Sequence, residues 1–388
     1  MSGVRSLLVI SHVTHHMHKG RVFAYEPYVR ELEVWAGLVP ELRIAAPTSE
    51  SAPPSDTAAL RASAVRMIPQ EMHRGKGWLG RLRQAIALPW ICTQLARAIR
   101  SADAVMVRCP GDLGLLGALL SPLLCSRRIC KYAGSWQPWV GEPMFWRLQR
   151  AVLRSGWWSA PVLTYGEWPG MPAHVVPWFS TALTEEQVRH ARAIVETRPP
   201  LEPPLRVLFV GRLSADKRVD AVIRSVQAAS ARAPMALTVV GDGPERRALE
   251  ALAADVLPGT RFTGSVPHER VLGEYSRAHV LVLVSRTEGW PKAITEAMAF
   301  GCVPIGRDSG AVRTILANGR GIALSGSTDA AIAKALVDLA AAPERWRAIS
   351  LAAAEWSWQY TLESFARGVV ALMNAWWSSG NRPFPTRH

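Results

Sequence analysis

Two runs of alternating strand and helix patterns, separated by a proline-rich segment, constrain the fold of this chain most. In the second run, short apolar segments fit buried strands, and helical patterns stand between them. These segments are residues 206–210, 236–240, 261–263, 279–284 and 303–305. Alternation of this kind is typical of a doubly wound parallel sheet. We therefore expect an α/β fold.

The first half of the chain repeats the pattern less regularly. The segments that fit strands are residues 4–10, 42–46, 104–107, 129–133 and 175–179. Residues 198–205, RPPLEPPL, can continue neither a helix nor a central strand. We expect four parts: a first domain over 1–180, a linker or hinge over 181–205, a second domain over 206–352, and a C-terminal helix within 353–388.

The formal net charge of +14 is uneven: residues 1–180 carry +9 and residues 181–388 carry +5. Such a surplus attracts nucleic acid, anionic lipid or a phosphorylated ligand, and charge alone does not choose among them. Five cysteines without a C-x-x-C pair fit a reducing, cytoplasmic compartment. The most apolar stretch, residues 113–125, is too short to span a bilayer.

Two segments of the first half allow more than one interpretation. His12, His15, His16 and His18 fall in an expected loop, and no cysteine or carboxylate stands at ligand spacing beside them. We expect this loop to line a cleft rather than to bind metal. Residues 74–100 mix arginine and lysine with apolar side chains, so they fit either an anionic membrane surface or two ordinary surface helices broken near Pro89.

Three polar turns follow expected strands of the second domain. The first is Gly211-Arg212-Leu213 with Lys217, the second is Gly241-Asp242-Gly243-Pro244, and the third holds Glu288, Gly289 and Pro291 before a helix with Glu296. Because the carboxyl ends of parallel strands meet at one edge of a sheet, these turns converge on one ligand site. Neither glycine turn is specific alone, since a dinucleotide fingerprint and a P-loop are both missing.

This ordered set resembles glycosyltransferase family 4, the retaining transferases with the GT-B fold of two facing Rossmann-like domains. The resemblance rests on Gly211, Arg212 and Lys217, on Gly241–Pro244, and on Glu288–Pro291 with Glu296–Ala299. It covers about residues 205–325 by motif, and residues 1–200 only by architecture.

The resemblance implies a role for each of these residues. Glu288 would bind the donor sugar, Glu296 the ribose, and Arg212 and Lys217 the diphosphate. The donor contacts would be completed by Gly211, Gly241, Gly243, Gly289, Trp290, Pro291, Lys292 and Ala293. No D-x-D occurs in the sequence, so we expect no metal and no cofactor besides a nucleotide-diphosphate-sugar as donor substrate.

The sequence also departs from the family pattern. Ser309-Gly310-Ala311-Val312-Arg313 stands where the family often has two glycines followed by a glutamate. The glycine-rich turn after the first strand is replaced by the histidine-rich segment, so acceptor contacts do not carry over. Residues 356–377 fit one long, aromatic-rich helix.

We therefore expect a hexosyltransferase that acts on a lipid-linked glycan in cell-surface polysaccharide biosynthesis, peripheral to the cytoplasmic face of the inner membrane. Two alternatives stay open: a non-catalytic membrane or assembly protein of the same fold, and a sugar-nucleotide epimerase. Nucleic-acid binding would explain the charge but none of the three turns.

Overall fold

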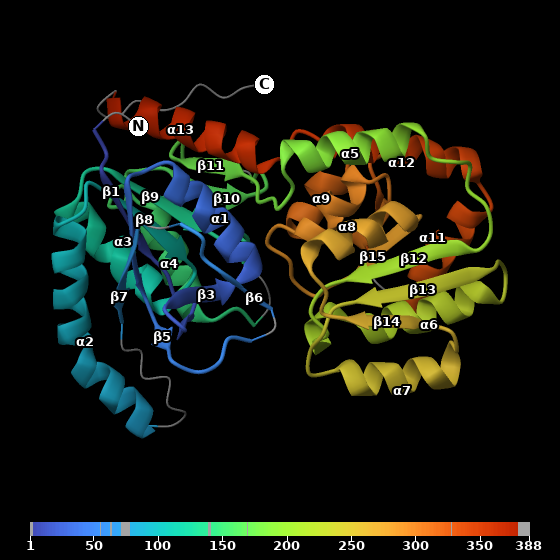
Figure 1. Ribbon diagram of the computed structural model, residues 1–388, viewed down its shortest axis with the longest axis horizontal. Coiled ribbons are helices and arrows are strands. Elements are labelled where there is room, and N and C mark those ends of the chain that lie inside the picture. The colour runs from blue at the N-terminus through green and yellow to red at the C-terminus, as the bar shows by residue number, and fades with distance from the viewer. Residues whose placement is uncertain are drawn as a thin grey trace. The chain divides into compact units, whose positions relative to one another are not determined.

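The chain forms two compact units. A computed structural model describes residues 3–54, 56–62, 64–70, 78–138, 141–168, 170–326 and 328–378. Unit 1 comprises Met1–Phe179 and Phe365–His388, and unit 2 comprises Ser180–Ser364. Each unit is built around its own parallel sheet (Figure 1).

Unit 1 contains a seven-stranded parallel sheet in the order β11-β10-β9-β8-β1-β4-β7. Its strands are β1 (Ser6–Ile10), β4 (Glu41–Ala46), β7 (Val65–Pro69), β8 (Ala104–Cys109), β9 (Arg128–Tyr132), β10 (Val162–Tyr165) and β11 (Val175–Trp178). All five residues of β1 are buried. A strand buried on both faces is what a parallel sheet covered by helices requires.

Helices cover the two faces of this sheet separately. One face packs against α1 (Glu26–Gly37) and α13 (Leu362–Ser378), with Trp35 and Phe365 in the core. The other packs against α2 (Trp78–Arg100), α3 (Asp112–Leu124) and α4 (Met144–Arg154). The last helix of the chain therefore completes the core of the first unit (Figure 1).

The histidine-rich segment is a strand, not the expected loop. β2 (His15–His18) and β3 (Arg21–Tyr25) form a hairpin that turns at Lys19 and Gly20, and β5 (Thr48–Ser49) and β6 (Thr57–Ala59) complete a small sheet. Lys19 and Gly20 both have positive φ, as a two-residue hairpin turn needs. The turn at Lys19 and Gly20 is the feature that indicates a hairpin, but the histidine-rich composition of the segment led us to expect a loop.

Unit 2 contains a six-stranded parallel sheet in the order β14-β13-β12-β15-β16-β17. Its strands are β12 (Leu205–Val210), β13 (Met235–Val240), β14 (Arg261–Gly264), β15 (Val280–Leu283), β16 (Val303–Arg307) and β17 (Ile322–Leu324). Counted from β12, the order is 3-2-1-4-5-6, which is that of a Rossmann fold. The expected α/β class and the two Rossmann-like domains are confirmed.

The helices of unit 2 fall into two groups. One group is α6 (Val219–Ser230), α7 (Arg246–Val256) and α11 (Asp329–Ala340), and the other is α5 (Glu185–Glu196), α8 (His268–Arg277), α9 (Lys292–Ala299) and α12 (Pro343–Ser357). A short 3-10 helix, η1 (Ala215–Lys217), precedes α6, and α10 (Gly310–Leu316) follows β16.

Residues 181–205, which we expected as a linker, lie inside unit 2. They include α5, which begins with a capping box between Thr184 and Gln187 and buries Val188, Ala191 and Val195. The helix is therefore part of the packed unit, and the chain passes between the units at Phe179 and again at Ser364.

One expectation and one of the open alternatives for helices were wrong. Residues 356–377 do not form one helix, because α13 starts afresh at a reciprocal cap in which Thr361 and Ser364 each accept from the other's backbone N–H. The alternative of two helices broken near Pro89 is also wrong, because α2 continues past Pro89 as one helix. The Thr93 hydroxyl donates to the Pro89 carbonyl oxygen. Residues 74–77 lie outside the described residues.

Among the described residues, none of the helices has both the length and the apolar content needed to cross a bilayer.

The burial of His15 makes unit 1 sensitive to mild acid. The side chain is fully buried, its Nδ1 lies 2.9 Å from the Val13 carbonyl oxygen, and its ring meets Tyr28 edge-on. Burial lowers the pKa of His15 to about 4 from an ordinary 6.5. The unfolded chain therefore binds a proton at a higher pH than the folded chain does, so stability is complete above pH 6.5 and falls as the pH drops toward 4.

We predict that His15 contributes about 2 kcal/mol to the loss of unfolding free energy between pH 7 and pH 5. Urea denaturation at both pH values should show a smaller loss for His15→Gln than for the wild type. His190→Gln, at an exposed position of α5, is the matched control for the substitution. An equal loss in the wild type and in His15→Gln would contradict the prediction.

Candidate active site

The sequence-predicted residues of unit 2 gather where the strand order reverses. β12 and β15 are neighbours in the sheet, but the crossovers that leave them run in opposite directions, so a crevice opens between their carboxyl ends. Lys217 follows β12 through η1, and Glu288 follows β15. The Lys217 Nζ donates to Glu288 Oε1 at 2.7 Å, which joins the two sides of the reversal.

Both side chains of this ion pair are largely shielded from solvent. The Lys217 side chain is 21% exposed and that of Glu288 is 15% exposed. A second contact crosses the same reversal, because the Arg286 N–H donates to the Asp216 carbonyl oxygen at 2.8 Å. The turn after β15 and the turn after β12 are therefore held together by backbone as well as by charge.

The two glycine turns are packed directly on each other. The Gly211 N–H donates to the Val240 carbonyl, and the Leu213 N–H donates to the Asp242 carbonyl, so pairing continues beyond the ends of β12 and β13. A Cβ on Gly241 would lie 1.9 Å from the Gly211 carbonyl oxygen, and one on Gly243 would lie 2.3 Å from that of Leu213. Glycine is required here by the neighbouring turn, before any ligand is considered.

Glu296 lies in a separate, buried cluster. It is on α9, and its side chain is 7% exposed. The Tyr275 hydroxyl donates to Glu296 Oε2 at 3.2 Å, and His268 Nε2 lies 3.4 Å from the same oxygen. Burial alone would raise the pKa of Glu296, but His268, Lys292 and the Tyr275 hydroxyl together hold it below its usual value. Glu296 is therefore a carboxylate at neutral pH.

His268 and Tyr275 were missed by sequence reasoning. Both belong to α8, where they stand seven residues apart and so share one side of the helix. The spacing of the pair was a usable signal, but only the packing of α8 against α9 reveals which carboxylate they meet.

The turn that leads into α9 carries the remaining predicted residues. Pro291 immediately precedes the helix, Lys292 and Ala293 form its first turn, and Gly289 and Trp290 come before it. The Trp290 ring packs edge-on against Tyr360, with centroids 5.5 Å apart. The first N–H groups of a helix have no intrahelical acceptor, so this turn can serve an anion.

The structure brings some of these residues into contact and leaves others apart. Lys217 meets Glu288, and Gly211 meets Gly241. Within the residues that the structure describes, no hydrogen bond or ion pair joins Glu296 to the Lys217–Glu288 pair. Arg212 is exposed. The roles that the resemblance gives to these side chains stay predictions.

In the turn after β16, where the sequence departs from the family pattern, Arg313 forms an ion pair with Asp308, at 2.7 Å from Nε to Oδ1. Gly310 has a φ of +56°, and a Cβ there would lie 3.4 Å from the Glu288 carbonyl oxygen. The positive φ favours glycine at this position, whereas the distance to the Glu288 turn leaves room for a Cβ.

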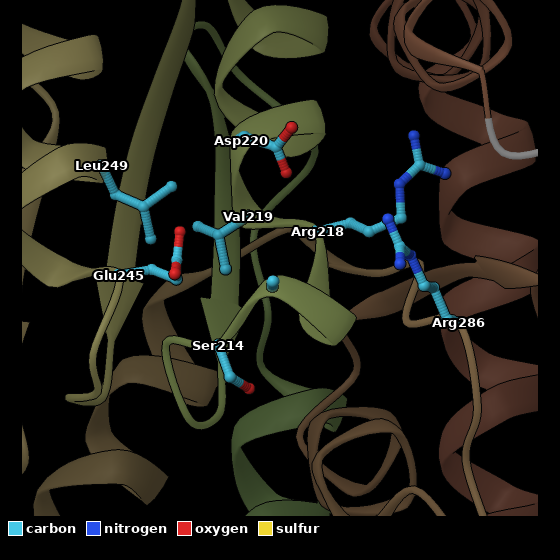
Figure 2. A pocket seen from close by; sticks show the side chains of 8 residues that line it. Ser214, Arg218, Val219, Asp220, Glu245, Leu249 and Arg286 are labelled. Carbon is cyan, nitrogen blue, oxygen red and sulfur yellow. The ribbon is translucent and has the colours of Figure 1, made fainter.

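A cavity of about 270 Å³ lies beside the site but does not contain it. Figure 2 shows Glu245 and Leu249 on one side of it and Arg218 and Arg286 on the other. Lys217, Glu288 and Glu296 do not line it. Its volume is just under the usual range for ligand pockets, and its walls mix acids with bases, so it is not a donor site by itself.

Unit 1 has its own point of strand reversal, between β1 and β8. His12 follows β1 and Gly111 follows β8, and a Cβ on Gly111 would lie 2.6 Å from His12 Nδ1. On β9 of the same sheet, Lys131 donates to Glu31 at 2.7 Å in a buried ion pair. Burial lowers the pKa of Lys131 to about 8, although Glu31 opposes that shift.

The described residues contain no group of three or more His, Cys, Asp or Glu side chains placed to hold a metal ion.

Comparison with known families identifies the second unit. Residues 204–342, from β12 to the end of α11, match the family described as glycosyl transferases group 1. This part of the chain belongs to that family. The match contains the Lys217–Glu288 pair, both glycine turns and Glu296, and it confirms the resemblance inferred from those residues.

Relatives of known activity match in part. A GDP-mannose-dependent α-(1-6)-phosphatidylinositol monomannoside mannosyltransferase from Mycolicibacterium smegmatis is 33% identical over 185 residues, covering 44% of this chain and 48% of that protein. The chain spans about half the length, or less, of the curated relatives it matches.

Several solved structures superimpose on nearly the whole chain. Sucrose-phosphate synthase from Thermosynechococcus elongatus superimposes with a TM-score of 0.70 at 19% identity, covering 97% of this chain and 100% of that one. HepE from Anabaena, in complex with UDP and glucose, gives 0.66 at 12% identity, covering 96% and 100%. At these identities the likeness shows the fold alone, which is GT-B.

We predict that Gly241→Ala destabilises unit 2 much more than Gly259→Ala does. Both glycines have positive φ, so both substitutions strain the backbone by about 1–2 kcal/mol. Only at Gly241 does the new methyl group meet a carbonyl oxygen, since nothing lies within 4 Å of a Cβ on Gly259. Urea denaturation should give a further loss of at least about 2 kcal/mol for Gly241→Ala. Equal losses of unfolding free energy for the two variants would contradict the prediction, because they would mean that the turns at Gly211 and Gly241 can move apart at no cost.

Proposed function

We propose that the protein transfers a sugar from a nucleotide-diphosphate-sugar to an acceptor hydroxyl, with the donor bound at the carboxyl edge of the unit 2 sheet. The observation that carries this proposal is the Lys217–Glu288 ion pair at the strand reversal. Membership of the group 1 glycosyl transferases supports it. A cation and a carboxylate in contact at a Rossmann crevice are suited to a ligand with an anionic part and a hydroxyl-rich part.

The chemistry of transfer assigns a task to each partner of the pair. When the sugar–diphosphate bond breaks, negative charge grows on the leaving nucleotide and positive character grows at the sugar ring. A diphosphate carries more charge than a carboxylate, so we infer that it takes over the Lys217 ammonium and frees Glu288 Oε1 for the sugar. Lys217, with Arg212, would then stabilise the leaving group where its charge develops.

Glu296 supports the nucleotide rather than the reacting bond in this proposal. Its Oε2 is held by Tyr275, with His268 in ion-pair distance, and Oε1 would accept hydrogen bonds from the ribose hydroxyls. The first turn of α9, with Lys292 and Ala293, would face the phosphates. Gly289, Trp290 and Pro291 would fix the entry to that turn.

The finer identity of the substrates is also part of the proposal. We infer a hexose donor, transfer with retention of configuration, and a lipid-linked glycan acceptor of cell-surface polysaccharide biosynthesis at the cytoplasmic face of the membrane. The M. smegmatis relative is named for GDP-mannose and for a phosphatidylinositol mannoside. The +9 charge of residues 1–180 favours an anionic, phosphate-bearing acceptor or surface.

A thermal-shift screen against GDP-, UDP- and ADP-sugars, followed by a transfer assay with the donor that binds, tests the proposal. One donor should raise the melting temperature by mass action. Glu288→Ala should lower kcat by at least about 100-fold, as expected for loss of a group that acts on the reacting centre. Glu296→Gln should raise KM with a smaller effect on kcat.

Lys334→Ala is the matched control for Lys217→Ala, because Lys334 pairs with Asp338 on the exposed side of α11. Only Lys217→Ala should abolish the shift with donor. A shift without turnover in any acceptor mixture would favour the non-catalytic alternative, and an isomerised donor without acceptor would favour an epimerase.

A further inference from the structure

One face of unit 1 is unusually apolar on its outer side. Ten large hydrophobic side chains are exposed among the described residues. Eight of them lie on α2, on α3, on α4 or just after α4: Ile86, Leu88, Trp90, Leu119, Leu123, Met144, Leu148 and Trp157. These three helices cover the same face of the sheet, with α3 next to both of the others (Figure 1).

The outer sides of these helices are apolar in an ordered way. On α4, Met144 is 83% exposed and Leu148 is 52% exposed, four residues and one turn later. On α3, Leu119 is 38% exposed and Leu123 is 65% exposed at the same spacing. Because residues four apart share a side of a helix, each pair forms a stripe. The helices thus bury one side on the sheet and present a second apolar side outward.

The charges on this face have one sign. Among the described side chains of α2 and α4, four arginines are exposed (Arg97, Arg100, Arg147 and Arg154) and no aspartate or glutamate occurs, and the one acid of α3 is Asp112 at its first turn. Of the nearby acids, Glu142 is buried against Arg150 and lies 3.5 Å from Arg147. On α2, exposed Arg97 continues the side of the helix that carries Ile86 and Trp90.

We propose that this face, formed by the outer sides of α2, α3 and α4, docks on the surface of an anionic lipid bilayer. Leucine, methionine and tryptophan side chains would enter the interface, and the arginines would pair with lipid phosphates above them. A second copy of the chain is a poor occupant, since it would place arginines against arginines. The proposal deepens the membrane location inferred above, because it names the surface that makes the contact, and it does not depend on sugar transfer.

The charge pattern also favours lipid over an acidic protein. An acidic protein would satisfy the arginines but would leave the leucine and methionine stripes of α3 and α4 against polar groups. A bilayer surface offers phosphates and hydrocarbon at successive depths, which suits a face that carries both. The face also lies entirely in the unit with the larger charge surplus.

Vesicle flotation of the full chain tests this proposal, with phosphatidylcholine alone and with phosphatidylcholine mixed with phosphatidylglycerol. The wild type should float with the mixed vesicles and much less with phosphatidylcholine alone or at high salt. Leu123→Glu with Leu148→Glu should weaken partitioning at least tenfold. Arg97→Gln with Arg100→Gln should weaken it about 25-fold, at about fivefold for each arginine.

Met17→Glu is the matched control, since Met17 is an exposed hydrophobic residue of the β2–β3 hairpin in the same unit. It should float like the wild type. Thermal melting must show that each variant is folded, and its shift with donor nucleotide should be unchanged, which separates this proposal from the proposed function. Flotation of the Leu123/Leu148 variant equal to the wild type would overturn the proposal, as would a wild-type dimer that the same variant dissociates.

Discussion

The reversal of strand order between β12 and β15 is the constraint on which the candidate site depends. Crossovers from two neighbouring parallel strands that run in opposite directions cannot both cover the same sheet edge, so the edge between them stays open. Lys217 and Glu288 reach this opening from segments 71 residues apart in sequence and meet at 2.7 Å. The topology thus creates an opening, and the sequence places opposite charges on its two sides.

The turns around this opening are fixed by packing before any ligand binds. Gly241 and Gly243 allow the turn after β13 to lie against the turn after β12, and the backbone bond from Arg286 to Asp216 ties in the turn after β15. In the proposed function, a donor would meet groups already in position, so less ordering entropy would oppose its binding. Closely packed turns, with an ion pair that can exchange partners, suit the nucleotide site proposed above.

Much of this arrangement follows from the sequence, and the limits have physical causes. Apolar runs predicted the parallel strands. Because the carboxyl ends of such strands share one edge of the sheet, the sequence also predicted that Lys217 and Glu288 lie close together. That rule concerns strand ends and does not predict contacts between helices, such as those of His268 and Tyr275 on α8 with Glu296 on α9. Local signals also misled where a polar composition concealed a strand, as at His15–His18.

Double-mutant coupling between Lys217 and Glu288 tests the central claim most directly. The affinity for free nucleotide diphosphate would be measured by calorimetry for the wild type, Lys217→Ala, Glu288→Ala and the double variant. If the diphosphate takes Lys217 away from Glu288, removal of the carboxylate alone should spare nucleotide diphosphate binding, and removal of Lys217 should weaken it whether or not Glu288 is present. Free nucleotide diphosphate that binds equally well to the wild type and to Lys217→Ala would contradict the account.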